Sequence, residues 1–450
     1  MGFSVLLAKP AVKYPVSPNG DVGVPLGLLY LASYVRQHNP STEVEFRDYR
    51  LQKSKGIERN LKTDLQCADV VGAGGSTTEI PDSIEIFRAA KQQGKITIAG
   101  GIFPSTNPEY LLKTGLVDYV VRGEGEEAFS ELVAALQQGK DAKHVDGISY
   151  LDNGALVNNP KRRGLDLQRL PLPAYDLAPM KEYAKIATGS IYSARGCSMS
   201  CDFCTVSKHW QNSYRPRPVA SVIKEMRMLA DYGFERIHFK DESMLHHQER
   251  ARELFGAIRD AGIGVKIKGK ARLDELDDDI LALLQSAGVD MIHVGIESIS
   301  RRSLVDMHKG LTISDIRGNL EKILQHGIGV NPVFMFSWLG ETPEDLRMNA
   351  AFIEDFGRNP HVVTYMSFIT PHPGTTLHTD AARKGLVVMT DDLDRYSHKQ
   401  PVAFPASLGA NGLELIVSTY HQLAKTLGME HVNPPIEPNY LEQIKLRVAA

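Results

Sequence analysis

The sequence predicts an α/β protein in which a doubly wound parallel sheet is followed by a partial (β/α)6 barrel. Apolar runs of strand length alternate with stretches of helical periodicity along most of the chain, which is typical of parallel sheets covered by helices. A proline-rich stretch at 161–179 interrupts this alternation once and indicates a linker. With 450 residues, the chain is also too long for one core and is expected to form roughly two or three domains.

Apolar runs predict five strands in the first domain, which is expected over 1–140. They are FSVLLAKP, EVEFRDY, ADVVGAGG, KITIAGG and VDYVVRGEG. Pro25 is a favourable first residue for the helix PLGLLYLASYVRQH, and helices over 80–93 and 125–138 separate the later strands. A β-hairpin around Asp-Asn-Gly in GISYLDNGALVNNP and the linker then fill 141–188.

Six further strands are predicted in the barrel, which is expected over 189–375. They are GSIYSAR, FERIHFKDE, GVKIKGKA, VDMIHVGIE, IGVNPVFMF and HVVTYMSFI, with helical stretches such as SVIKEMRMLADYG and DDDILALLQSAG between them. In parallel barrels the C-terminal ends of the strands carry the chemistry. The special residues that gather at these ends are Cys197, Asp241, Glu242, Lys270, Glu297 and the TPHPGT segment. The C-terminal region, 376–450, is mixed and partly helical and contains no motif.

The composition excludes several classes of protein. The formal net charge is −3 and no long basic run occurs, which argues against nucleic-acid binding. No apolar run approaches the ~20 residues of a membrane span, and the N-terminus lacks the pattern of a secretory signal. Three of the four cysteines lie within eight positions, which favours a metal site in a reducing compartment over a disulfide framework. We therefore expect a cytoplasmic protein without a membrane span.

The clustered cysteines are the strongest chemical signal in the sequence. Cys197, Cys201 and Cys204 have the spacing Cys-x3-Cys-x2-Cys. A structural zinc ion usually takes four ligands in pairs, and no second pair is present, although His209 would complete a Cys3His site. Cys67 lies far upstream at the end of a helical stretch, and we expect it to be a small buried hydrophobic residue. The main interpretation is a [4Fe–4S] cluster, in which three thiolates hold three irons and the fourth iron stays open.

This motif resembles that of the radical S-adenosylmethionine (SAM) superfamily. Phe203, the aromatic residue before the third cysteine, is part of the resemblance, as is the position after the first strand of a β/α barrel. The resemblance implies that SAM binds the open iron through its amino and carboxylate groups. One electron then cleaves a carbon–sulfur bond of SAM and releases a 5′-deoxyadenosyl radical. It further implies an electron donor such as flavodoxin or ferredoxin.

Two strand ends of the barrel extend the resemblance to SAM-binding segments. HFKDESML resembles a second-strand segment and implies that Asp241 or Glu242 lies near the SAM amine. HVGIESIS resembles a fourth-strand Gly-x-Glu-Ser segment and implies that Glu297 lies near the SAM ribose or amino group. TPHPGTTL resembles a sixth-strand segment that lines the cavity.

The segment after the fifth strand departs from the family pattern. WLGETPED resembles a Gly-x-Pro-Gly-Glu-Thr turn, but Ser337 and Leu339 replace the first glycine and the proline. The local turn geometry is therefore an open question. For Thr342 and Pro343 we expect a capping role at the next helix in preference to a catalytic one.

The N-terminal half resembles the Rossmann-like cobalamin (B12)-binding domain of class B radical SAM proteins. The matching pieces are PLGLLYLASYV, ADVVGAGGSTTEI, IAGGIFPSTNPE and VDYVVRGEGEEAFSEL. The cobalamin contacts expected on these pieces are Gly75, Ser76, Thr77, Gly100, Gly101, Pro104, Gly123, Glu124, Gly125 and Glu126. Glycines at strand ends let backbone approach a bulky ligand, and GEGE opens a helix whose amides are free to bind polar groups. The alternative is that these are ordinary turn glycines.

One expected cobalamin feature is absent from the sequence. The Asp-x-His-x-x-Gly motif, which supplies a cobalt-ligating histidine in many B12 proteins, does not occur. The residue that faces the cobalt is then expected within 76–79. The dimethylbenzimidazole tail is expected to lie in a groove over Gly100 and Gly101, where a side chain would occupy the space.

The predicted function is that of a cobalamin-dependent radical SAM methyltransferase. The resemblance implies methylation of an unactivated carbon, or of phosphorus, in a biosynthetic small molecule. The alternative is a B12-linked cyclase or ring-rearrangement enzyme that transfers no methyl group. The modest net charge and short C-terminal region favour a small-molecule substrate.

Overall fold

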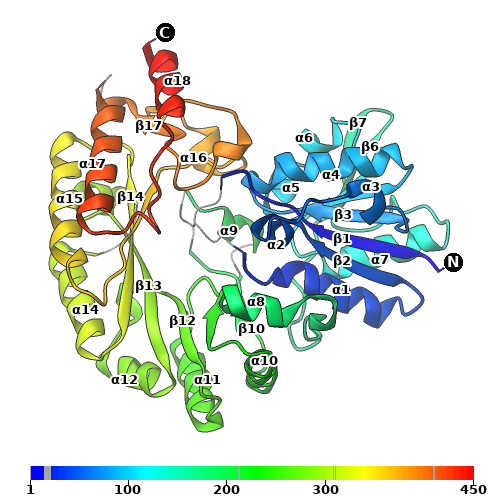
Figure 1. The fold of residues 1–450 in the computed structure, drawn as a ribbon, viewed down its shortest axis with the longest axis horizontal. Helices are drawn as coiled ribbons and strands as arrows, with labels where there is room; N and C mark the ends of the chain where they lie inside the picture. The colour runs from blue at the N-terminus through cyan, green and yellow to red at the C-terminus, as the bar shows by residue number, and fades with distance from the viewer. Residues whose placement is uncertain are drawn as a thin grey trace.

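The computed structural model describes residues 2–14, 22–199, 201, 203–210, 213–307, 309, 311–408 and 411–449. Two sheets lie beside each other, the N-terminal one blue and cyan and the second one green and yellow in Figure 1. The first has helices on both faces and the second is curled with helices along its outer side, which confirms the predicted fold class. No helix in these described ranges is long and apolar enough to cross a membrane.

The first sheet has seven strands, of which the first five are parallel. Its spatial order is β2 (Glu43–Asp48), β1 (Ser4–Lys9), β3 (Val70–Gly74), β4 (Ile96–Gly100), β5 (Tyr119–Val121), β6 (Ile148–Asp152) and β7 (Ala155–Asn158). The predicted hairpin is β6–β7, and β6 pairs antiparallel with β5. The hairpin therefore extends the N-terminal sheet, because its backbone completes the hydrogen bonding of an otherwise free edge.

Alternate residues of these buried strands supply two separate cores. Leu7 and its neighbours pack under α1 (Leu26–His38) and α7 (Glu126–Gln137) on one face. Leu6 packs under α4 (Ile80–Gln92) on the other. The helical stretch expected before Cys67 is α3 (Leu61–Asp64). Other short elements were not predicted, because they are too brief to show periodicity: α2 (Tyr49–Ser54), the 3-10 helix η1 (Thr77–Glu79), α5 (Ile102–Thr106) and α6 (Pro108–Leu112).

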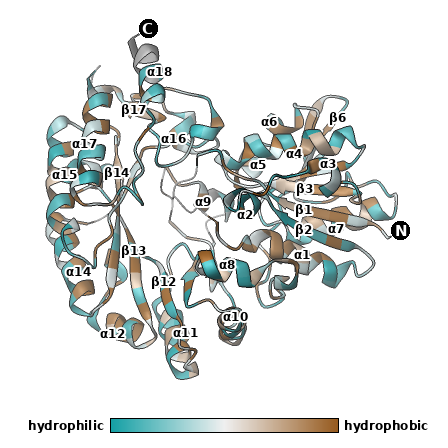
Figure 2. Ribbon diagram, viewed as in Figure 1, coloured by the Kyte–Doolittle hydropathy of each residue, from teal (hydrophilic) through white to brown (hydrophobic). Residues whose placement is uncertain are grey.

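The second sheet has six strands, all parallel, as the sequence predicted. Its order is β15 (Tyr365–Phe368), β14 (Gly329–Phe336), β13 (Val289–Glu297), β12 (Lys266–Ala271), β11 (Arg236–Phe239) and β8 (Gly189–Ile191). The connecting helices are α10 (Val219–Asp231), α11 (Gln248–Ala261), α12 (Asp278–Ser286), α13 (Arg301–Asp306), α14 (Ile313–Gln325) and α15 (Pro343–Gly357). The result is an open half-barrel whose polar and apolar stretches alternate along the strands (Figure 2).

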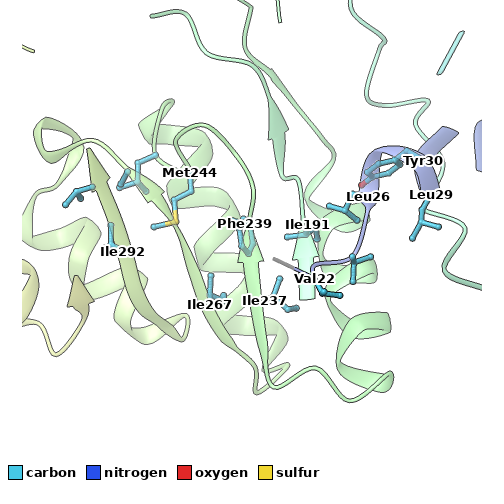
Figure 3. Close-up of a cluster of buried hydrophobic side chains, with 14 of the residues drawn as sticks. Val22, Leu26, Leu29, Tyr30, Ile191, Ile237, Phe239, Met244, Ile267 and Ile292 are labelled. Atoms are coloured by element: carbon cyan, nitrogen blue, oxygen red, sulfur yellow. The ribbon is translucent and has the colours of Figure 1, made fainter. Parts of the chain in front are cut away.

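The core of the half-barrel is continuous with that of the N-terminal domain. Ile237, Phe239, Ile267 and Ile292 belong to the same buried cluster as Leu26 and other residues of α1 (Figure 3). In the linker, α8 (Met180–Ile186) contributes Met180 and Tyr183 to this cluster. The two domains therefore share buried apolar surface, which favours a fixed relative placement.

The C-terminal region folds back over both domains. It contains α16 (Thr376–Thr379), β16 (Leu386–Val388), the 3-10 helices η4 (Leu393–Arg395) and η5 (Ala406–Leu408), β17 (Ala403–Pro405), α17 (Gly412–Thr426) and α18 (Pro438–Ala449). Helix α17 packs on α15 of the half-barrel, and η4 lies against η1 of the first domain. The region therefore bridges the half-barrel and the N-terminal domain.

Candidate functional site

The three clustered cysteines lie in the loop that follows β8. This loop runs from the short strand β9 (Ala194–Arg195) to α9 (Thr205–His209), at the C-terminal end of the half-barrel. All three thiols are partly buried, and burial raises the pKa of the Cys197 thiol. The Cys204 N–H donates to the Cys201 carbonyl at 3.1 Å, and the Met199 N–H donates to Cys197 Sγ at 3.4 Å.

The fourth cysteine corrects one expectation from the sequence. Cys67 is exposed, so the prediction of a buried hydrophobic residue is wrong. The reason is local: α3 ends at Asp64, and Cys67 follows in a turn at the surface. It lies outside the cluster loop.

His209, the fourth ligand of the zinc alternative, lies in the wall of a cavity described below. Burial lowers its pKa to about 4, and its buried Nδ1 has no hydrogen-bond partner in the part of the chain that the structure describes. Within the described ranges, no group of three or more Cys, His, Asp and Glu side chains is arranged to hold a metal ion. A [4Fe–4S] cube does not require side chains that converge on one metal ion, because its three thiolates bind three different irons.

The two acidic residues after β11 face different surroundings. Asp241 is 3% exposed and accepts a hydrogen bond from the Ser193 N–H at 2.7 Å. Burial raises its pKa to about 6, although the Ser193 hydrogen bonds act in the opposite direction. Glu242 instead lines the cavity and accepts a hydrogen bond from Lys270 Nζ at 3.1 Å. Of the two, Glu242 is the carboxylate that a ligand in the cavity reaches.

Glu297 ends β13 in an unusual backbone conformation. Its φ is +68°, and its carboxylate lies 3.3 Å from Lys309 Nζ. A Cβ on Gly295 would lie 2.6 Å from Glu297 Oε1 and 3.3 Å from Lys309 Nζ. A side chain at 295 would therefore displace this ion pair, and glycine leaves room for the pair to fold back over the strand. Sequence reasoning found Gly295 and Glu297 but missed Lys309, which no motif indicates.

The divergent turn after β14 keeps a left-handed backbone without glycine. Ser337 has a φ of +65°, and its N–H donates to Glu341 Oε2 at 2.7 Å. Glu341 is fully buried and also accepts from Asn349 Nδ2 at 3.2 Å, and burial raises its pKa to about 8. Serine thus replaces the first glycine of the family pattern at position 337, and the buried Glu341 stabilises the resulting turn.

The capping prediction for the next helix is confirmed. Thr342 is the N-cap of α15, with Asp345 completing a capping box, and Pro343 is the first helical residue. Phe203 of the cluster loop packs edge-to-face on Trp338 in this turn, with ring centroids 5.7 Å apart. Trp338 in turn donates from Nε1 to Asp306 at 2.8 Å.

A cavity of about 550 Å³ lies at the C-terminal edge of the first sheet and extends to the half-barrel. Seven of the ten predicted cobalamin contacts line it, namely Gly75, Gly100, Gly101, Gly123, Glu124, Gly125 and Glu126. The barrel side is lined by Ser190, Tyr192, Arg195, Val206, His209, Trp210, Lys240 and Glu242. One cavity therefore joins the glycine-rich strand ends to the segment around the cysteines.

The other three predicted contacts lie away from the lining of this cavity. Ser76 forms a capping box with Glu79 at the start of η1. Thr77 Oγ1 lies 3.2 Å from His372 Nδ1, in the TPHPGT segment of the half-barrel. Pro104 is buried within α5.

Gly100 and Gly101, at the end of β4, are glycines for two different structural reasons. A Cβ on Gly100 would contact only the Val121 carbonyl oxygen, at 3.9 Å, so a side chain there would enter the cavity. Gly101 has a φ of +103°, and its Cβ would lie 2.7 Å from Gly75 Cα. The sequence explained Gly101 only by the space that a ligand needs. The close packing of its backbone on Gly75 already requires a glycine at this position. Gly100 is the position that fits a bulky ligand.

The GEGE segment connects the two domains through buried ion pairs. Glu124 accepts from Arg195 Nη1 at 3.0 Å and from Arg215 Nη1 at 3.2 Å, while Glu126 accepts from Arg195 Nη2 at 2.6 Å. Arg195 is only 3% exposed and also lies over the rings of Tyr30 and Trp210. The sequence predicted these glutamates beside a ligand but contained no sign that arginines next to the cysteines bind them.

Comparisons with known proteins agree with this arrangement. The profile of the B12 binding domain matches residues 16–133, and that of the Radical SAM superfamily matches residues 191–353. An uncharacterised methyltransferase of Pyrococcus horikoshii is 28% identical over 431 residues, which cover 94% of this chain and 90% of that protein. The anaerobic magnesium-protoporphyrin IX monomethyl ester cyclase of Rubrivivax gelatinosus is 26% identical over 416 residues, covering 88% of this chain and 73% of the cyclase.

A solved structure has the same fold over nearly the whole chain. It is the radical S-adenosylmethionine methyltransferase TsrM of Kitasatospora setae with cobalamin and a [4Fe–4S] cluster bound. The TM-score is 0.76 at 19% identity, and the match covers 98% of this chain and 90% of TsrM.

The two matched domains, their order and the fold assign the cofactors. They are cobalamin for the N-terminal domain and a [4Fe–4S] cluster with SAM for the half-barrel. The residues present fit this set, since Arg195 and Val206, on either side of the three cysteines in the chain, line a cavity whose Gly100 edge admits a bulky group. The chain is an enzyme, and it belongs to the cobalamin-binding, class B branch of the radical SAM superfamily.

Proposed function

We propose that the protein is a cobalamin-dependent radical SAM methyltransferase that methylates an unactivated carbon, or phosphorus, of a biosynthetic small molecule. One observation carries the proposal: the cavity at the Gly100 edge is also lined by Arg195, two residues before Cys197, and by Glu242. A group held in this cavity is therefore next to the cluster loop. The similarity to an uncharacterised methyltransferase over 94% of the chain supports the same function.

Different residues of the chain have different roles in the proposed reaction. Cys197, Cys201 and Cys204 anchor the cluster, and the carboxylates of Glu242 and Glu297 bind the polar groups of SAM. When bound, the cofactors supply an activated methyl group and a 5′-deoxyadenosyl radical. Apolar side chains such as Phe129 and Leu31 line the inner part of the cavity and exclude water from it.

The buried arginine of the cluster loop has a positioning role. Arg195 is held by Glu124 and Glu126 of the N-terminal domain, so the loop with the three cysteines is fixed relative to the Gly100 edge. Short distances between the two sites are required for transfer of a small group from one to the other. Asp241 supports the start of the same loop through Ser193.

Among the described residues that the N-terminal domain contributes to the cavity wall, none is a histidine. Lys9 and Arg50 are the basic residues of this domain in the cavity wall, and Lys9 forms an ion pair with the buried Glu79. Burial lowers the pKa of Lys9, with Glu79 acting in the opposite direction. We propose that cobalamin would bind here without a histidine of this domain on its cobalt, as the missing Asp-x-His-x-x-Gly motif indicates. Ser76 and Thr77, which the sequence predicted near the metal, lie outside the lining of this cavity.

The test measures what becomes of SAM. Reconstituted protein is incubated anaerobically with SAM, hydroxocobalamin and a reductant such as reduced flavodoxin, and the products are separated by chromatography. Methyl transfer from SAM leaves S-adenosylhomocysteine, whereas reductive cleavage leaves 5′-deoxyadenosine. We expect both products in cobalamin-loaded protein, and 5′-deoxyadenosine alone without cobalamin. Absence of S-adenosylhomocysteine in the loaded protein would contradict the proposal.

A second candidate is a cyclase or ring-rearrangement enzyme. It is favoured by the 26% identity to a magnesium-protoporphyrin IX monomethyl ester cyclase, which covers 88% of this chain. The same experiment separates the two functions, because cyclisation consumes SAM only by reductive cleavage. Formation of 5′-deoxyadenosine without S-adenosylhomocysteine supports the cyclase.

A further inference from the structure

A row of polar side chains crosses the middle strands of the half-barrel. The strand register pairs His238 with Lys268, Lys270 with His293, and His293 with Asn331. Paired residues of adjacent strands point to the same face of a sheet, so these five side chains share one face. The residues between them are fully buried in the core on the other face: Ile237, Phe239, Ile267, Ile292 and Val294. The polar row therefore faces the concave interior of the half-barrel.

This row carries positive charge that is only partly compensated. Lys270 is paired with Glu242, and Arg236 at the base of the strands is paired with Asp290. In the described part of the chain, Lys268 has no hydrogen-bond or ion-pair partner, although it is partly buried. Burial and the nearby Arg236 lower the pKa of Lys268, and Asp290, which is paired with Arg236, offsets this only in part. An anionic ligand would offset the remaining cost of burying this lysine.

The same lysines act on both histidines. Burial lowers the pKa of His293 to about 4, with Lys268, Lys240 and Lys270 contributing in the same direction. The pKa of His238 is also lowered by burial and then by these lysines. The two rings are stacked, with centroids 5.4 Å apart, so they are two neutral imidazoles side by side in a positive environment.

The hydrogen bond of His293 determines which of its ring nitrogens carries the proton. Asn331 donates from Nδ2 to the Val363 carbonyl, so its Oδ1 is the acceptor 2.9 Å from His293 Nδ1. Nδ1 is then the donor, and Nε2 of the neutral ring is an acceptor. This Nε2 is buried and finds no hydrogen-bond partner among the described residues, and the same holds for Nε2 of His238. The half-barrel interior therefore presents an unsatisfied acceptor beside an unpaired ammonium group.

We propose that the row formed by His238, Lys268, Lys270 and His293 binds a monoprotonated phosphoryl or phosphonyl group of the substrate. An anionic oxygen of this group accepts from Lys268, and its P–O–H donates to His293 Nε2. Sulfate carries no proton near neutral pH and offers His293 no donor. The inference rests on the proposed function and adds the chemical class of the substrate.

The position of the row makes it an anchor remote from the reacting atom. His238 and Lys270 each lie one residue before the end of their strand, whereas Lys268 and His293 lie three and four residues before the ends of theirs. At about 3.3 Å per residue, Lys268 and His293 are therefore roughly 10–13 Å below the strand ends at the cluster side. Binding energy from such a distant group orients the substrate at the reacting centre.

The experiment measures binding of inorganic phosphate, methylphosphonate and sulfate to cluster-loaded holoenzyme by calorimetry. It is done at pH 6, where inorganic phosphate and methylphosphonate are mainly monoanions with a P–O–H proton and sulfate has none. We expect phosphate and methylphosphonate to bind at least 10-fold more tightly than sulfate. Lys268→Met should weaken phosphate binding about 10- to 100-fold, and His293→Phe should abolish the preference for phosphate over sulfate. Lys266→Met, an exposed position on the same strand, is the matched control and should bind as the wild type does.

Three outcomes would overturn the inference. They are no phosphate binding by the wild type, equal binding of sulfate and phosphate, and phosphate binding that Lys268→Met leaves unchanged. The first two need no variant, so a folding defect does not affect them. Wild-type protein that produces S-adenosylhomocysteine but does not bind phosphate contradicts only this inference. Protein that binds phosphate as expected but produces no S-adenosylhomocysteine contradicts only the methyltransferase proposal.

Discussion

Arg195 Nη2 lies 2.6 Å from Glu126 Oε1, which joins the residue two positions before Cys197 to the first turn of α7 in the other domain. Both side chains are almost fully buried, at 3% and 5% exposure. Water does not compensate either charge, so the pair depends on both partners. The contact fixes the cluster loop against the cobalamin domain.

Glu126→Gln should therefore destabilise the protein and loosen the joint between its domains. Removal of one partner from a buried ion pair costs about 3–5 kcal/mol when the other charge is left uncompensated. Arg195 keeps Glu124, which it shares with Arg215, so the loss is expected below that range. Thermal unfolding should shift to lower temperature, and cobalamin retained after desalting should fall. Glu127→Gln is the matched control, since Glu127 pairs with Arg162 at 3.5 Å in a more exposed position. Equal effects of the two substitutions would contradict the role assigned to Glu126.

The cluster ligands are tested by iron and sulfide analysis of anaerobically reconstituted protein. About four irons and four sulfides per chain are expected, since three thiolates anchor one cube. Cys197→Ala, Cys201→Ala and Cys204→Ala should each lose the cluster. Cys67→Ala should retain it, because Cys67 is exposed outside the loop. Loss of iron in the Cys67 variant would show that the three-ligand assignment is wrong.

Glu297→Gln should weaken SAM binding while the cluster is retained. The substitution removes the carboxylate that binds SAM in our proposal and leaves Lys309 as an uncompensated positive charge. A lost charged hydrogen bond of about 1.5–3 kcal/mol predicts roughly 10- to 100-fold weaker binding. Equilibrium dialysis with labelled SAM measures the affinity. Unchanged affinity would assign Glu297 to structure alone.

Substitutions at Gly100 and Gly101 test two effects separately, namely the space available to a ligand and the packing of the backbone. Gly100→Leu should block cobalamin binding with little effect on the fold, because a side chain there meets only the cavity and one carbonyl oxygen. Gly101→Leu should lower thermal stability as well, because its positive φ and its 2.7 Å approach to Gly75 admit no side chain. Cobalamin absorbance after desalting and thermal unfolding distinguish the two effects. Wild-type protein that retains no cobalamin would instead indicate a vestigial domain.

Glu341 makes stability depend on pH. Its folded pKa of about 8 lies above the ordinary 4.5, so the folded state keeps a proton that the unfolded state has lost between those values. Unfolding then releases a proton, and stability falls as pH rises through this window, by on the order of 5 kcal/mol in total. Glu341→Gln mimics the protonated form and should remove that part of the pH dependence. Denaturant unfolding of the wild type and of Glu341→Gln at pH 5 and pH 8 measures this dependence. Equal losses of unfolding free energy in the two proteins would contradict the assignment to Glu341.

The sequence by itself determined the parallel strands of both sheets and the cluster loop. Buried parallel strands read as short apolar runs, and helices between them show their own period, so local pattern is sufficient. The spacing of Cys197, Cys201 and Cys204 is local as well, because one loop supplies all three thiolates. The glycines at 75, 100 and 101 were recognisable because they directly follow or end strands.

The tertiary structure decided which side chains meet across the sequence. Asp241 and Glu242 are adjacent in the chain, yet Asp241 is bound to Ser193 and Glu242 lines the cavity. The pairs Arg195–Glu126 and Glu297–Lys309 join segments that no local period connects. The row of His238, Lys268, Lys270 and His293 exists only in the register of three neighbouring strands. Such contacts depend on how separate elements pack, and packing is a property of the whole chain rather than of any one stretch.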